Sequence, residues 1–284
     1  NINLQSINLP INQWIFNEFI KVQKLVTKNI EIFRFDEAAK HAYQFAWHSY
    51  CDWYLEFLKP IFNSKNIEEI KEARVFSSFM LANILKILHP FIPFFSESVW
   101  SKNNYKTIFK ENLISSSWPN YKNLSKFNKN QVDINNLIEL ISNIRSTKAE
   151  LKITPKLFCD VSFSEKPKKL HKLINNNINL IKQVGRINGV IKSKINDKNT
   201  IDILVLKEKI SLGFSEDVNL ASQKERILQK IESINKQISN LNNKLKNKAY
   251  VKNAPKEIVQ NDKKLTKELT IEEEKLRSIV ASIN

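Results

Sequence analysis

Residues 217–284 contain two apolar ladders with coiled-coil spacing, and no other pattern constrains the fold as tightly. The first ladder recurs in steps of four and three, at Ile227, Ile231, Ile234, Ile238, Leu241 and Leu245. The second has the same stepping with polar positions at Asp262 and Glu272, and consists of Ile258, Leu265, Leu269, Leu276, Ile279 and Ile283. A short loop separates the ladders, so the second helix must return antiparallel to the first. Two helices of about 27 residues predict an arm about 40 Å long.

The charge of this predicted arm is uneven along its length. Its tip carries five lysines and no acid between residues 244 and 256, namely Lys244, Lys246, Lys248, Lys252 and Lys256. Four acids lie towards the base of the return helix, at Glu268, Glu272, Glu273 and Glu274. One interpretation is a solvated coiled-coil surface. The other is a phosphate-binding tip, because lysine neutralises phosphates without a fixed geometry. Arg226 and Lys230, on the flank of the first helix, are the next candidates for such contacts.

The whole chain is strongly basic, with a formal net charge of +16 and an isoelectric point near 9.6 over 284 residues. This balance favours nucleic acid or an anionic surface as partner. The excess is spread over the molecule rather than confined to a tail. Lys, Asn and Ile are abundant throughout, so part of the basicity is consistent with an A- and T-rich coding bias.

Several classes of function are disfavoured by what the sequence lacks. Its two cysteines, Cys51 and Cys159, are far apart, and its four histidines lack metal-binding spacing, so we expect neither a disulfide framework nor a metal site. Three glycines form no phosphate-binding loop, and no nucleophile motif is present, so we expect no catalytic residue in this chain. Without a membrane-length apolar run or a leader, we expect a cytoplasmic protein. Because the chain starts at Asn1 without methionine, we expect it to be a piece of a longer protein.

Residues 1–155 predict a helical bundle. Helical periodicity or helix-start signals mark segments around 15–26, 36–57, 66–89, 96–100 and 137–151. We expect Pro60 to end the second helix, Asn66 and Glu69 to form a capping box, Ser96 to cap a short helix, and Thr154-Pro155 to close the last one.

The next residues, 156–216, predict a small α/β connector. Residues 158–163 and 200–214 alternate like strands, and residues 168–187 have the pattern of an amphipathic helix. The expected organisation is therefore mostly α: bundle, connector, and a coiled-coil arm over residues 217–284.

The aromatic segment Trp47 to Glu56 has two interpretations. Ala39, Tyr43, Ala46, Tyr50, Trp53 and Phe57 define one helical face, which favours burial in the core. Stacking on nucleic-acid bases is the alternative role for the same rings.

Five motifs, in order, resemble the anticodon-binding bundle of class I aminoacyl-tRNA synthetases of the valine, isoleucine and leucine group. They are Phe35-Asp36-Glu37-Ala38-Ala39, Cys51-Asp52-Trp53-Tyr54-Leu55-Glu56, Lys59-Pro60, Leu88-His89-Pro90-Phe91-Ile92-Pro93-Phe94 and Ser117-Trp118-Pro119. The resemblance covers residues 10 to about 120 and implies a tRNA partner.

The C-terminal arm is similar to that of the valyl-tRNA synthetase family. The match consists of Lys244-Leu245 with Asn247, Tyr250-Val251 and Ala254-Pro255, between the two heptad helices. The resemblance adds Asn247 to the expected tRNA-binding residues Lys244, Lys248, Lys252 and Lys256. Residues 141–155 resemble the helix that leads into the C-terminal region of that family, which makes Arg145 and Lys148 weaker tRNA-binding candidates.

The resemblance implies a valine–tRNA ligase in which this chain binds valine-specific tRNA and supplies no catalysis. The family's two nucleotide-binding signatures, its editing domain and the first bundle helix are absent from the chain, so anticodon-reading residues cannot be assigned. ATP and magnesium are implied for the full-length enzyme, with no cofactor in this part. Two alternatives stay open: the related isoleucine enzyme, whose cysteine-rich zinc-binding tail has no counterpart here, and a non-enzymatic RNA-binding coiled-coil protein. An intramolecular hairpin predicts a monomer, whereas a zipper built from one ladder predicts a dimer.

Overall fold

The computed structural model describes residues 4, 7–121, 131–163, 169–191, 199–215, 218–247, 250 and 254–283. The chain divides into two compact units, Asn1–Ile138 and Glu139–Asn284. The sequence predicted three parts; the structure groups the connector and the arm in the second unit. The boundary falls inside one helix, which begins in the first unit and ends in the second.

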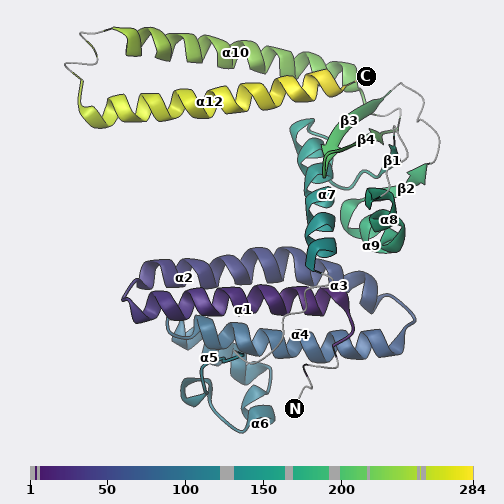
Figure 1. Ribbon diagram of the computed structural model, residues 1–284, viewed down its shortest axis with the longest axis vertical. Coiled ribbons are helices and arrows are strands. Elements are labelled where there is room, and N and C mark those ends of the chain that lie inside the picture. Colours follow the sequence, from purple (N-terminus) through teal and green to yellow (C-terminus); the bar gives the residue numbers. More distant parts are fainter. Residues whose placement is uncertain are drawn as a thin grey trace. The chain divides into compact units, whose positions relative to one another are not determined.

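The first unit is a helical bundle (Figure 1). Its elements are α1 (Pro10–Glu31), α2 (Phe35–Gln44), the π-helical segment η2 (Phe45–Tyr54), α3 (Leu55–Phe62), α4 (Ile67–Leu88), α5 (Pro93–Lys102), α6 (Tyr105–Phe109) and the 3₁₀ turn η3 (Leu113–Ser115). The core lies where α1 packs on α2, η2 and α4. Phe16 meets Phe76 edge to face at 6.2 Å, and Phe19 meets Phe45 at 5.6 Å between ring centroids. The predicted bundle is confirmed.

The second predicted helix is continuous but changes its winding and its buried face. Ala38, Ala42 and Phe45 are buried in place of the expected Ala39 and Tyr43. The π-helical segment then bonds i→i+5 rather than i→i+4, which shifts the inward positions to Tyr50 and Tyr54.

Pro60 does not end this helix, as the sequence had suggested, but lies inside α3, which continues to Phe62. Only two residues of the helix follow Pro60, so the backbone hydrogen bond that a proline cannot donate is lost in the last turn.

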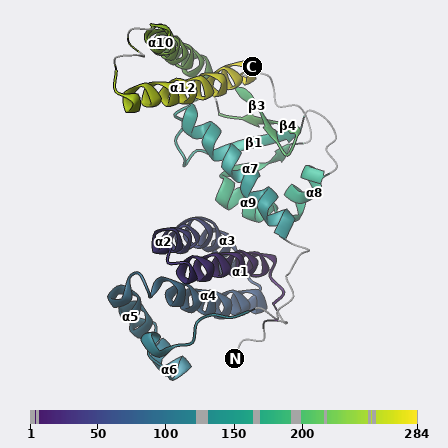
Figure 2. The ribbon, with the colours of Figure 1, turned by 60° about the vertical axis from the view of Figure 1, so that its left-hand side comes forward.

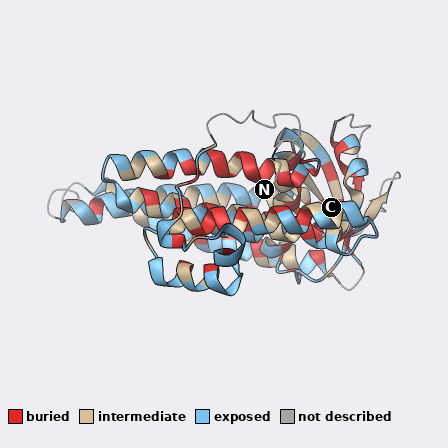
Figure 3. Ribbon diagram, turned by 90° about the horizontal axis from the view of Figure 1, so that it is seen from below, coloured by how far each residue is buried: buried red, intermediate tan, exposed pale blue. Residues whose placement is uncertain are grey.

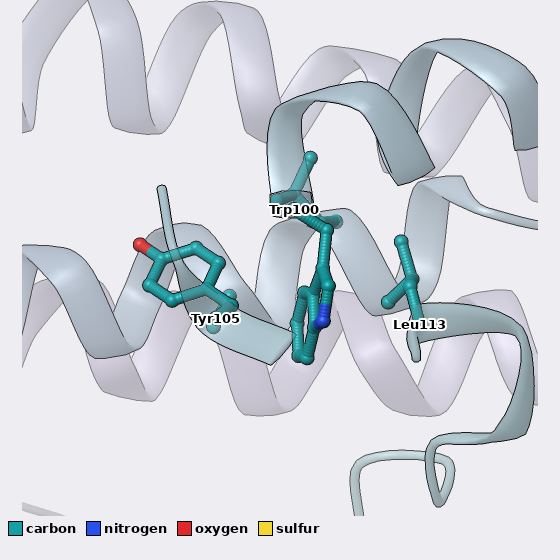
Figure 4. Close-up of a cluster of buried hydrophobic side chains, with 5 residues drawn as sticks. Trp100, Tyr105 and Leu113 are labelled. Carbon is teal, nitrogen blue, oxygen red and sulfur yellow. The ribbon is translucent and has the colours of Figure 1, made fainter. Parts of the chain in front are cut away.

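The α4–α6 region is fixed by a local core. Asn66 caps α4 by accepting from the Glu69 backbone N–H at 3.3 Å, as predicted, but its own N–H donates to Ser64 Oγ at 3.2 Å. Ser96 does not cap α5, which begins at Pro93; its hydroxyl lies 2.8 Å from His89 Nδ1 and donates to Ile92 O at 2.9 Å. Figure 4 shows Trp100, Tyr105 and Leu113 converging in a buried cluster.

Helix α7 (Gln131–Glu150) ends four residues before the expected Thr154-Pro155 stop. Lys152 adopts a left-handed conformation with φ 50°, and the Ile153 N–H donates back to Lys148 O at 2.8 Å. This pairing, together with Lys152 N–H to Ala149 O at 3.0 Å, is a Schellman motif that satisfies the last carbonyls of the helix.

The predicted α/β connector is a four-stranded mixed sheet of order β2-β1-β4-β3 with two short helices. Its elements are β1 (Cys159–Phe163), α8 (Lys169–Asn176), α9 (Ile178–Gly185), β2 (Ile187–Ile191), β3 (Thr200–Val205) and β4 (Glu208–Gly213). β1 pairs parallel with β2 and antiparallel with β4. The single helix expected over 168–187 was wrong, because a turn at Asn177 divides it and Ile187 begins β2.

The arm is an antiparallel pair, α10 (Leu220–Lys246) and α12 (Lys256–Ser282), which lie side by side in Figures 1 and 2. The first ladder is confirmed, with Ile227, Ile231 and Ile234 buried. The second has a different phase towards the tip: Val259 is buried, whereas Ile258 and Leu265 are 48% and 44% exposed. A heptad spacing is kept by positions 259, 262, 266, 269, 276 and 283. The predicted spacing is therefore confirmed, whereas the assignment of the larger Ile258 and Leu265 to the inward face was wrong.

Figure 3 shows how burial alternates along the helices of both units. In the described part of the chain, no helix is both long and apolar enough to cross a membrane.

Candidate nucleic-acid interface

The base of the arm is fastened to the rest of the second unit. Arg226 donates through Nη2 to Glu150 O at 3.2 Å, and the Glu150 carboxylate pairs with Lys275. Lys224 Nζ donates to Ile283 O at 3.1 Å, and Ile283 forms an isolated antiparallel bridge with Ile201 of β3. The two helices are therefore tied at one end to α7 and the sheet.

Several ion pairs lie along the flank of the arm. Lys230 Nζ lies 2.6 Å from Glu272 Oε1 across the two helices, and Lys236 Nζ lies 2.8 Å from Glu232 Oε1 along α10. On α12, Lys264 is 3.9 Å from Glu268, and Arg277 contacts Glu273. These acids compensate the basic charge of the flank. Arg226 and Lys230, predicted as tRNA contacts, thus have protein partners in this structure.

The tip differs in charge. Between residues 244 and 262 the sequence has five lysines against Glu257 and Asp262. Lys244 lies in the last turn of α10 with its side chain exposed. Asn247 is the C-cap of the same helix, and Lys256 is the first residue of α12. Lys248 and Lys252 lie outside the described residues, so their predicted role stays a prediction.

Tyr250 connects the two ends of this tip. Its hydroxyl donates to Asp262 Oδ2 at 2.7 Å, which explains the polar residue in the second ladder. Its backbone N–H donates to Asn247 Oδ1 at 3.3 Å, and its carbonyl accepts from the Ala254 N–H at 2.9 Å. The bond to the Asp262 carboxylate raises the pKa of the Tyr250 hydroxyl, because a neutral phenol donates to it and a phenolate is repelled.

The two candidates on α7 hold the connector together. Arg145 Nη2 donates to Val184 O at 2.9 Å. Lys148 is 3% exposed and donates to Leu157 O at 2.9 Å and Arg186 O at 3.0 Å. Burial lowers the pKa of the Lys148 ammonium. Both contacts are structural, and the Lys148 ammonium is not exposed to a phosphate.

Two surface features of the bundle were missed by the sequence analysis. Tyr43 and Trp47, assigned to the buried segment, are 57% and 53% exposed and stack nearly parallel, 6.3 Å apart. The helical spacing of four residues could have paired them, but the sequence analysis placed Tyr43 on the buried face, which in the structure runs through Ala38, Ala42 and Phe45. The second feature is an apolar pocket of about 460 Å³ lined by Thr27, Ile30, Glu31, Phe35, Pro90, Phe91 and Trp118.

Among the described side chains, no group of three or more His, Cys, Asp or Glu residues could hold a metal ion. Cys51 and Cys159 are free thiols, the first exposed and the second buried. The arrangement offers a basic tip on an anchored rod, which suits binding to an anion-rich surface.

Two family models match the chain. The anticodon-binding domain of tRNA ligases matches residues 12–163, and the valyl tRNA synthetase tRNA binding arm matches residues 219–284.

Three similar curated proteins are named valine–tRNA ligase. A valine–tRNA ligase of Pelagibacter ubique is 36% identical over 257 residues, which is 90% of this chain and 29% of that protein. One from Zymomonas mobilis is 31% identical, over 95% of this chain and 30% of its own length. One from Mesorhizobium japonicum is 29% identical, over 96% and 29%. The chain therefore spans less than a third of the length of these relatives.

Proposed function

Because the chain belongs to the valyl-tRNA synthetase family of tRNA ligases, we propose that it is the tRNA-binding part of an enzyme that esterifies valine to its tRNA. The bundle provides the anticodon-side domain, and the arm provides a second contact through its tip. The observation that supports the arm's role is its charge distribution: ion pairs compensate the flank, whereas lysines dominate the tip.

Lysines at the tip act on the phosphate backbone. Such contacts position a nucleic acid and carry little sequence information, so the arm contributes affinity and orientation. We assign the selection of valine-specific tRNA to contacts elsewhere in the complete enzyme. We assign the protein to the cytoplasm, where tRNA is charged, and expect a monomer, because α10 and α12 pack on each other within one hairpin.

The activation step is assigned to sequence that this chain does not contain. It has no glycine-rich phosphate loop and neither of the family's nucleotide-binding signatures. We therefore expect ATP and magnesium to act in the full-length enzyme. The chain alone should not support valine-dependent exchange of pyrophosphate into ATP; measurable exchange by the purified chain would contradict this division of labour.

The tip is tested in the complete enzyme by replacing Lys244, Lys248, Lys252 and Lys256 together with alanine. Each lost phosphate contact contributes on the order of 0.5–1 kcal/mol, so apparent tRNA affinity should fall about tenfold or more at low salt. Valine activation should be unchanged, and helical content by circular dichroism should be retained.

A matched control removes the same charge from the flank, by replacing Lys236, Lys263, Lys264 and Lys267 with alanine. All four are exposed on the same two helices. We expect a much smaller loss of affinity. Equal losses in both variants would mean that overall charge, rather than the tip, binds tRNA, and unaltered affinity in the tip variant would rule out the tip.

A further inference from the structure

Three hydrogen bonds at the tip of the arm are centred on Tyr250. Tyr250 reaches α12 through its hydroxyl, α10 through its N–H, and the approach to Pro255 through its carbonyl, at 2.7, 3.3 and 2.9 Å respectively. Asn247, the partner of the N–H, is the C-cap of α10. A single residue therefore joins the end of one helix, through its backbone N–H, to the second turn of the other, through its side chain.

The partner of the hydroxyl is unexpected on electrostatic grounds. Asp262 places a carboxylate on the inner face of α12 close to a tip that has five lysines. A negative charge there opposes phosphate binding. It also interrupts an apolar seam, where valine or leucine would pack better. The carboxylate thus weakens both the packing of the seam and the attraction of the tip for phosphates. The favourable contact that it makes is the hydrogen bond from Tyr250.

We infer that Tyr250 is a positioning residue, which holds the end of α10 to α12 through its bonds to Asn247 and Asp262, so that Lys244 and Lys256 at the two helix ends meet the phosphates of tRNA together. The inference rests on the proposed function of the arm. Lysine side chains lose conformational freedom on binding, and two helix ends that are already held together leave less entropy to be lost. A free tip would have the same charge but would engage fewer phosphates at a time.

The first test is Tyr250→Phe in the complete enzyme, which removes the hydroxyl without changing charge. Apparent tRNA affinity should fall about two- to tenfold, the range of one hydrogen bond. The log–log salt dependence should also become shallower, because fewer phosphates are engaged. The KM for tRNA should rise while the rate of valine activation stays the same. Loss of hairpin stability alone would change thermal unfolding without altering the salt slope.

The second test asks whether substitutions at Asp262 weaken or strengthen tRNA binding. Asp262→Asn keeps an acceptor for the Tyr250 hydroxyl and removes the charge, so binding should be retained or improved. Asp262→Ala removes both, and alanine favours helix, so α12 should stay folded. Positioning predicts weaker binding for Asp262→Ala. If electrostatics alone mattered, both variants would bind tRNA more tightly than the parent.

The double variant Tyr250→Phe/Asp262→Ala should lose no more affinity than Tyr250→Phe. Unchanged affinity in Tyr250→Phe, or tighter binding in Asp262→Ala, overturns the inference. If the quadruple lysine variant still loses affinity, the proposed function stands and only the positioning role fails. If neither the lysines nor Tyr250 affects binding, the proposed function of the tip fails with it.

Discussion

Tyr54 belongs to a buried polar network in the first unit. Its buried hydroxyl donates to Asn12 Oδ1 at 2.7 Å, and Asn12 Nδ2 donates to Glu72 Oε1 at 2.8 Å. The Glu72 carboxylate also accepts the Leu9 N–H at 2.9 Å, at the N-terminus of α1. The network joins α1, η2 and α4. Asn12 and Tyr54 are both 0% exposed, so water cannot reach them. Removal of one partner therefore leaves the polar group of the other without a hydrogen bond.

This burial has a pH consequence. Desolvation raises the pKa of Tyr54, and raises that of Tyr121 to about 12, from a usual value of 10. An unfolded chain releases these protons near pH 10 while the folded chain keeps them. The stabilising contribution is therefore complete below pH 10 and is lost as pH rises through the folded values. The free energy of unfolding should fall above pH 10 by up to about 1.4 kcal/mol per pH unit for each such tyrosine.

Tyr54→Phe tests this dependence. At neutral pH it should cost about 1–3 kcal/mol, because Asn12 loses its donor. Above pH 10 its stability should fall less steeply than that of the parent. Urea unfolding followed by tryptophan fluorescence reports the first unit alone, since all five tryptophans lie before residue 119. Tyr43→Phe, at an exposed position, is the control; a parallel decline in Tyr54→Phe and parent would contradict the argument.

At the scale of elements, the arm is held by a core that thins towards the tip. Ile231 is 4% exposed, whereas Ile238, one heptad later, is only half-buried. Leu228 lies on the outer face and is 48% exposed. At the base of the arm, the sheet and α7 also bury the apolar side chains, whereas in the rest of the hairpin only the two helices bury them. Burial by a single partner helix leaves a flank of each apolar side chain in water.

Three alanine substitutions should therefore have graded effects. Ile231→Ala should destabilise the second unit by about 2–4 kcal/mol, because a buried cavity is created. Ile238→Ala should cost about 1 kcal/mol, since it is half-buried, and Leu228→Ala should be within about 0.5 kcal/mol of the parent. Urea unfolding followed by circular dichroism measures all three. Equal losses at Ile231 and Ile238 would argue against a core that is concentrated at the base.

Much of this element structure could be predicted, and the failures have identifiable causes. Heptad and helical spacing predicted α1, α4, α10 and α12, because amphipathic period is a local property of the sequence. The π-helical winding of Phe45–Tyr54 has no such local signal. The second ladder was assigned through the larger Ile258 and Leu265, yet Val259 and the Thr266 position face inward. Side-chain size could not decide between two phases that share one spacing.

The charge pattern of the candidate site could be predicted from the sequence, but its hydrogen-bond network could not. The lysine cluster between residues 244 and 256 can be read from the sequence, and the polar break at Asp262 was visible without an explanation. Its hydrogen bond to Tyr250 depends on how the tip folds back on α12. Likewise, nothing in the sequence distinguishes Lys148, which binds two backbone carbonyls, from an exposed lysine on the same helix.

At the scale of the whole molecule, the basic excess is shared by both units. Residues 1–138 carry 16 basic and 12 acidic side chains, and residues 139–284 carry 29 and 17. This distribution favours weak contacts at several places over one strong site. Phosphate contacts dominate such binding and carry little sequence information, so the isolated chain should bind different tRNAs with similar affinity.

The salt dependence of that binding is the last prediction. If about three to five phosphates are contacted, log affinity should fall with log salt at a slope of roughly −2 to −4. Equilibrium titration of labelled tRNA between low and physiological salt measures it. Replacing Lys244, Lys248, Lys252 and Lys256 should make the slope shallower without abolishing it, because the remaining charge is spread over both units. A slope near zero, or a strong preference for one tRNA at physiological salt, would mean that contacts to bases outweigh those to phosphates, and the tip would then be a secondary feature of recognition.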